Sequence, residues 1–84
     1  MYEYYFTFRS VTAATRAGKV LERARVPNHL VRTPKQVQEL GCGYSLRVKG
    51  EDLFRAKTSL QQEKERYNRI FRKGKDGNWQ EVST

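Results

Sequence analysis

The hydrophobic period of the chain changes at Ser10, within residues 2–24, YEYYFTFRSVTAATRAGKVLERA. Before Ser10, apolar and polar side chains alternate in an aromatic-rich stretch, which predicts a β-strand over residues 2–8. After it, apolar residues recur at steps of three and four, which predicts an amphipathic helix over residues 11–25. A hydroxyl of Ser10 or Thr12 would cap the first turn of this helix by accepting from an unpaired backbone N–H.

The rest of the chain repeats this change of period after a break at Pro27, which lacks an N–H and ends the first helix. A Thr-Pro pair predicts the start of a short helix, because proline suits the first helical position. Two adjacent acids suit the positive N-terminal end of a second long helix. The remaining predicted elements are a strand over residues 28–32, a short helix over 33–40, a strand over 44–49, a helix over 51–65 and a strand over 67–72.

The resulting order of elements, βαββαβ with a short helical loop between strands 2 and 3, predicts a ferredoxin-like α+β fold. Both helices would pack on one face of a four-stranded sheet and form a two-layer sandwich. We expect residues 1–72 to form a single domain. Residues 73–84 are predicted to be either a basic tail or a terminal hairpin. The residues expected near the centre of the core are Phe6, Leu21, Leu46 and Leu60.

The composition excludes several classes of protein. With 84 residues, of which 37% are hydrophobic, the chain has enough apolar surface to fold despite its high charge. It contains 17 Lys and Arg against 9 Asp and Glu, so its net charge is +8 and it would attract phosphates or an acidic partner. No apolar run is long enough to cross a membrane, and the first residues do not resemble a signal peptide. These features predict a cytoplasmic protein.

Few side chains are suited to catalysis or metal binding. Cys42 is the single cysteine and His29 the single histidine, so neither an internal disulfide nor a zinc cluster is expected. The adjacent carboxylates Glu51 and Asp52 fit a helix start better than an acid–base pair. We therefore expect no metal or cofactor, and a carrier or binding protein rather than an enzyme.

One segment nevertheless points to thiol chemistry. Cys42 lies between Gly41 and Gly43, so little side-chain bulk surrounds its sulfur, and the flexible backbone permits several N–H groups to point at one spot. Cationic neighbours would lower the pKa of the thiol and favour the nucleophilic thiolate. The cations expected there are Arg32, Lys35 and Arg47. A buried structural cysteine in a tight turn is the alternative.

Three stretches resemble the selenium/sulfur carrier protein-like family, and the resemblance spans about residues 4–70. They are Phe8-Arg9-Ser10-Val11-Thr12-Ala13-Ala14, Thr33-Pro34-Lys35 and Cys42-Gly43-Tyr44-Ser45-Leu46-Arg47. The resemblance implies that Cys42 holds sulfur or selenium as a persulfide or selenopersulfide and passes it to a partner protein. It also implies that the surrounding motif consists of Thr33, Pro34, Lys35, Gly43 and Arg47.

Two other functions fit the sequence. The order of elements is also that of RNA-recognition domains, whose sheets stack bases on aromatic side chains; Tyr5 and Tyr44 would have to share one face. The positive charge alone would give nonspecific, salt-sensitive binding to nucleic acid. A basic interaction module that docks an acidic protein is the second alternative. An exposed edge of the fourth strand would permit a homodimer.

Overall fold

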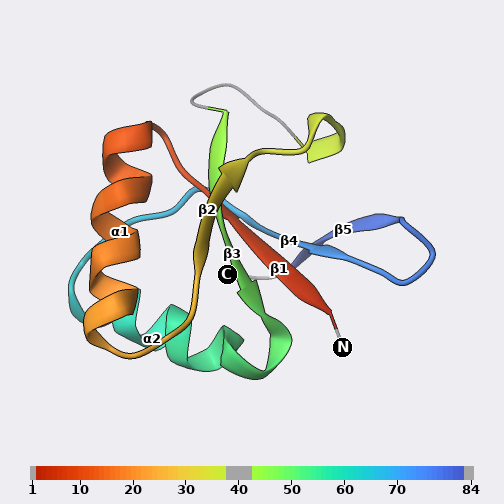
Figure 1. The fold of residues 1–84 in the computed structure, drawn as a ribbon. Coiled ribbons are helices and arrows are strands. Elements are labelled where there is room, and N and C mark those ends of the chain that lie inside the picture. Colours follow the sequence, from red (N-terminus) through yellow and green to blue (C-terminus); the bar gives the residue numbers. More distant parts are fainter. Residues whose placement is uncertain (1, 38–42, 83–84) are drawn as a thin grey trace.

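The computed structural model describes residues 2–37 and 43–82, which form a five-stranded antiparallel sheet and two α-helices (Figure 1). The strand order is β2-β3-β1-β4-β5. The predicted α+β fold is confirmed, and the order of the first four strands is compatible with a ferredoxin-like arrangement. The elements are β1 (Glu3–Thr7), α1 (Val11–Arg23), β2 (His29–Arg32), η1 (Lys35–Val37), β3 (Tyr44–Lys49), η2 (Gly50–Asp52), α2 (Leu53–Gln62), β4 (Ile70–Lys73) and β5 (Trp79–Val82).

The core lies between the two helices and one face of the sheet. Phe6 on the central strand β1 is aligned with Leu46 on β3 and Ile70 on β4, so these three side chains point to the same face. Leu21 and Leu60 reach this layer from α1 and α2. All four residues predicted at the centre are buried, which confirms that part of the prediction. A slip of one residue in any strand would turn this row to the opposite face, so burial fixes the register.

Both helices end earlier than their hydrophobic pattern predicts. α1 begins after Ser10, whose Oγ accepts from the Ala13 N–H at 3.1 Å, and it ends at Arg23 rather than at residue 25. Arg25 has a φ of 60°, in the left-handed region, and the Val26 N–H bonds back to the Leu21 carbonyl at 2.8 Å. This pair of features closes the last turn and reverses the chain.

α2 ends in the same way, at Gln62 instead of residue 65. Lys64 has a φ of 58°, and the Glu65 N–H bonds to the Leu60 carbonyl at 2.9 Å. Glycine is the residue that usually marks such an end, and here a lysine and an arginine take its place. Neither end was therefore visible in the sequence.

Strand β4 begins three residues later than predicted, because Tyr67 belongs to the core layer instead of the strand. Its ring meets Phe6 edge-on, with 4.9 Å between the ring centroids. Burial raises the pKa of the Tyr67 hydroxyl, and a hydrogen bond with Gln61 opposes that shift. The sheet ladder then starts at Ile70, which lies opposite Phe6.

A second, smaller cluster of aromatic side chains lies on the sheet face that the helices leave open. Tyr5 and Phe71 are aligned on β1 and β4, and both are buried although they face away from the helices. Trp79 on β5 covers Tyr5, with 5.0 Å between the ring centroids. This explains why β4 has apolar residues of both parities: Ile70 serves the main core and Phe71 the aromatic cluster.

Candidate functional site

The Thr-Pro-Lys segment and the glycine that follows Cys42 meet at one end of the β2–β3 pair. Arg32, the last residue of β2, lies opposite Tyr44, the first residue of β3. The next residues outward, Thr33 and Gly43, are joined by a 2.6 Å hydrogen bond from the Thr33 N–H to the Gly43 carbonyl. Two segments that are separate in the sequence thus form one structural unit.

A buried pair of hydroxyl groups stabilises this unit. The Oγ1 of Thr33 and the Oγ of Ser45 are 2.6 Å apart, and one donates to the other. Both residues are buried. Ser45 was not among the predicted site residues, although it lies within the Cys42-Gly43-Tyr44-Ser45-Leu46-Arg47 stretch. Its hydroxyl ties β3 to the Thr-Pro-Lys segment through a direct side-chain contact.

Removing either hydroxyl is expected to destabilise the protein, because it leaves the other without a partner in a buried place. Thr33→Val and Ser45→Ala should each lower the free energy of unfolding by about 1–3 kcal/mol. The double variant should cost less than the sum of the two, since no unpaired hydroxyl then remains. Urea unfolding of the four proteins measures this coupling. Strict additivity would contradict a direct contact between the two groups.

Pro34 and Lys35 lead into a single 3-10 turn, η1. The Val37 N–H bonds to the Pro34 carbonyl at 3.0 Å, and the buried Val37 side chain anchors the turn, while Lys35 is exposed. The end of the short helix predicted for residues 33–40 lies outside the described residues. Gly41 and Cys42, the centre of the predicted thiol site, lie outside them as well.

The two predicted arginines lie on opposite faces of the sheet. The Arg32 guanidinium is 5.4 Å from the centroid of the Tyr44 ring, on the same face as Leu46 and next to Gly43. Arg47 is aligned with His29 on the open face, further along β3, and its Nε lies 3.6 Å from a carboxylate oxygen of Glu3. The structure therefore places Arg32 at the Thr33–Gly43 end and directs Arg47 to Glu3.

The aromatic pair expected for an RNA-recognition sheet is not formed. Tyr5 is aligned with Arg47 on the open face. Tyr44 precedes Ser45 on β3 and so falls on the other face, where it meets Arg32. The RNA-recognition alternative requires Tyr5 and Tyr44 to share a face, and they do not. Tyr44 lies three positions before Arg47, and an odd step along a strand changes the face.

Within residues 2–37 and 43–82, no three His, Cys, Asp or Glu side chains come close enough to hold a metal ion. No helix in the same part of the chain is long and apolar enough to cross a membrane.

The chain is thus a small α+β protein in which a Thr-Pro-Lys segment is hydrogen-bonded to the glycine that follows its single cysteine in the sequence. A family model described as "Putative Se/S carrier protein-like" matches residues 3–72, and the chain belongs to this family. The match runs from β1 into β4 and leaves β5 outside. Neither the curated proteins nor the solved structures gave a match.

Proposed function

We propose that the protein is a sulfur or selenium carrier in which Cys42 accepts the atom from a donor protein and hands it to an acceptor protein. Membership of the carrier-like family supports this role. The observation that carries it is the hydrogen bond between Thr33 and Gly43, because it fixes the Thr-Pro-Lys segment to the residue bonded to Cys42. The two parts of the motif, which are separate in the sequence, are thus joined at Thr33 and Gly43, and Gly43 directly follows Cys42 in the chain.

The transfer step is a thiolate exchange. The Cys42 thiolate attacks the terminal sulfur of a donor persulfide, R–S–SH. A new S–S bond forms on Cys42 while the S–S bond of the donor breaks, and the donor sulfur leaves as a thiolate with the electron pair. The proton stays on the transferred sulfur, whose oxidation state does not change. A donor selenopersulfide, R–S–SeH, would react in the same way, and a second exchange would release the atom to the acceptor.

The chain suits this step in two respects. Cys42 is the only cysteine, so no second thiol of the same chain can displace the carried atom as an internal disulfide. Arg32 and Lys35 come directly before and after Thr33-Pro34, and positive charge favours a thiolate or an anionic persulfide. Arg47 would contribute less, because it lies on the opposite face of the sheet from Arg32 and its Nε is 3.6 Å from a carboxylate oxygen of Glu3.

Intact-mass measurement tests whether Cys42 can be loaded. Reduced protein is incubated with a low-molecular-weight persulfide and freed of excess reagent. Its mass is then measured before and after treatment with dithiothreitol. We expect a mass increase of one sulfur atom that dithiothreitol removes, and no increase in Cys42→Ser. Protein isolated from cells without reductant is expected to carry the same adduct or its selenium equivalent. If wild-type protein gains no mass from the donor, the proposed carrier function is wrong.

The rate of alkylation of Cys42 by iodoacetamide tests its activation. An ordinary thiol titrates near a pKa of about 8.5, whereas an activated one reacts at full rate well below about pH 8. Arg32→Ala is expected to slow the reaction and shift its pH profile upward. Arg47→Ala should do so to a smaller extent, and Arg9→Ala, which removes the same charge at an exposed position, serves as the control. A wild-type profile that follows the ordinary pKa would contradict activation.

A further inference from the structure

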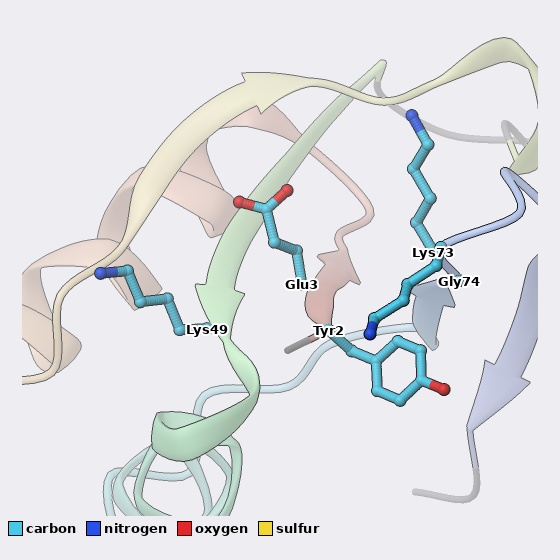
Figure 2. A pocket seen from close by; sticks show the side chains of 6 residues that line it. Tyr2, Glu3, Lys49, Lys73 and Gly74 are labelled. Carbon is cyan, nitrogen blue, oxygen red and sulfur yellow. The ribbon is translucent and has the colours of Figure 1, made fainter.

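A basic hollow of about 440 Å³ opens at the other end of β3 from Gly43 (Figure 2). Its lining residues are Tyr2, Glu3, Lys49, Lys73, Gly74 and Lys75. A neighbouring hollow of about 350 Å³ shares Tyr2, Gly74 and Lys75 with it and adds Arg72, Asp76, Asn78 and Gln80. The two hollows therefore adjoin at Tyr2, Gly74 and Lys75, at the end of the sheet, and together they are called the depression.

Hydrogen bonds hold both walls of this depression in place. On one side, the Gly50 N–H bonds to the Tyr2 carbonyl at 2.8 Å, and a Cβ at position 50 would come within 3.1 Å of that oxygen, so glycine permits the approach. On the other side, Asp76 accepts from the backbone N–H of Asn78 at 3.0 Å and from its side chain at 2.9 Å. The turn that carries Lys73 and Lys75 is thus organised without a ligand.

Among the residues that the structure describes, the lysines of the depression have no carboxylate partner of their own, and the Lys73 Nζ lies over the Trp79 ring, 5.8 Å from its centroid. Lys49 and Lys73 flank Glu3 in the register of the sheet, and Figure 2 shows the Glu3 side chain between them. Glu3 is partly neutralised by Arg47, whose Nε lies 3.6 Å away. Within the described part of the chain, Lys49, Lys73 and Lys75 form no ion pair. Three ammonium groups from β3, β4 and the turn therefore remain without a carboxylate of their own.

Tyr2 gives the depression an aromatic wall. The Arg72 guanidinium lies over the Tyr2 ring, 4.5 Å from its centroid, and the residue is exposed. An aromatic ring in this position offers a stacking surface to a planar group, and a cation packed on the ring adds to the attraction for a ligand that is both planar and anionic. Such a combination of an aromatic ring with several free cations suits a nucleotide chain better than an acidic peptide.

We propose that this depression binds single-stranded nucleic acid, with backbone phosphates on Lys49, Lys73 and Lys75 and a base against Tyr2. The cations come from three segments of the chain and are spread over two adjoining hollows, which favours a chain of nucleotides over a compact anion. The net charge of +8 would bring such a ligand to the protein from a distance. This inference is independent of the carrier function, because the depression and Gly43 lie at opposite ends of β3.

Fluorescence anisotropy with a labelled single-stranded RNA of about 12 nucleotides tests the proposal. The triple variant Lys49→Gln, Lys73→Gln, Lys75→Gln is expected to bind roughly 100-fold more weakly at about 0.1 M salt, and the slope of log K against log salt should fall by about 2. The control is Lys19→Gln, Arg23→Gln, Lys57→Gln, which removes the same charge from the two helices. The control should lose far less affinity and keep the slope.

The aromatic contribution is tested separately. Tyr2→Ala should weaken binding roughly 10-fold, whereas Tyr2→Phe should bind like the wild type because its ring still stacks. Cys42→Ser should leave binding unchanged. Equal losses in the two triple variants would overturn the proposal in favour of nonspecific attraction to the whole molecule. Binding of polyglutamate as tight as that of RNA, with no effect of Tyr2→Ala, would overturn it in favour of an acidic protein partner, and no binding by wild type would also overturn it.

Discussion

Phe6→Ala is expected to lower the free energy of unfolding by about 3–5 kcal/mol, a large part of the roughly 5–15 kcal/mol that stabilises a small domain. Phe6 is 0% exposed and occupies β1, the strand between β3 and β4. Its ring packs against Tyr67, with 4.9 Å between centroids, so truncation loses both hydrophobic burial and an aromatic contact. Urea unfolding followed by circular dichroism measures the loss.

The matched control is Phe54→Ala. Phe54 lies on α2 and is 79% exposed, so the same chemical change removes little buried surface. We expect a change within about 0.5 kcal/mol. If Phe6→Ala costs no more than Phe54→Ala, then Phe6 is not at the centre of the core and the register of β1 is wrong.

Leu46→Ala has the second largest expected effect, a loss of about 2–5 kcal/mol. Leu46 is 1% exposed and packs beneath α1, where a Cβ at Gly18 would lie 3.6 Å from its Cδ2. Glycine at that position lets the helix approach β3 closely, so the space left by a missing leucine side chain would not easily be filled. The predicted result is a lower midpoint of urea unfolding with an unchanged slope.

Leu30 provides the control for this variant, since it lies directly opposite Leu46 on the edge strand β2 but is 46% exposed. Leu30→Ala is expected to cost much less than Leu46→Ala. Equal costs would mean that the edge strand is as well covered as the centre of the sheet, which would contradict the described packing.

The sequence allowed the elements and the core to be predicted because both depend on local periodicity. The change of period at Ser10, and the inward direction of Phe6 and of Leu46 within their own strands, follow from residues that are close in the chain or repeat along one strand. The ends of the helices were missed, because Arg25 and Lys64 adopt a backbone conformation that glycine usually signals. Hydrogen bonds and tertiary packing stabilise these turns, and no local pattern reports them.

The sequence predicted which segments form the candidate site, but it did not predict the contacts between them. The motif indicated that Thr33 and Gly43 belong together, and the β2–β3 register joins them. The pairing of Arg47 with Glu3 depends on which strand lies beside β3, and the hydroxyl contact of Thr33 with Ser45 depends on the exact register. Both are properties of strand pairing between distant parts of the chain, which a single sequence does not report.

Strand β5 affects which truncated forms of the chain keep the sheet covered. Residues 3–72 match the family, so a chain cut after residue 72 keeps the whole matched segment. It would lose Trp79, however, and uncover Tyr5 on the side away from the helices. We expect such a shortened protein to expose a hydrophobic patch and to self-associate. The β4–β5 hairpin therefore keeps this face of the sheet covered.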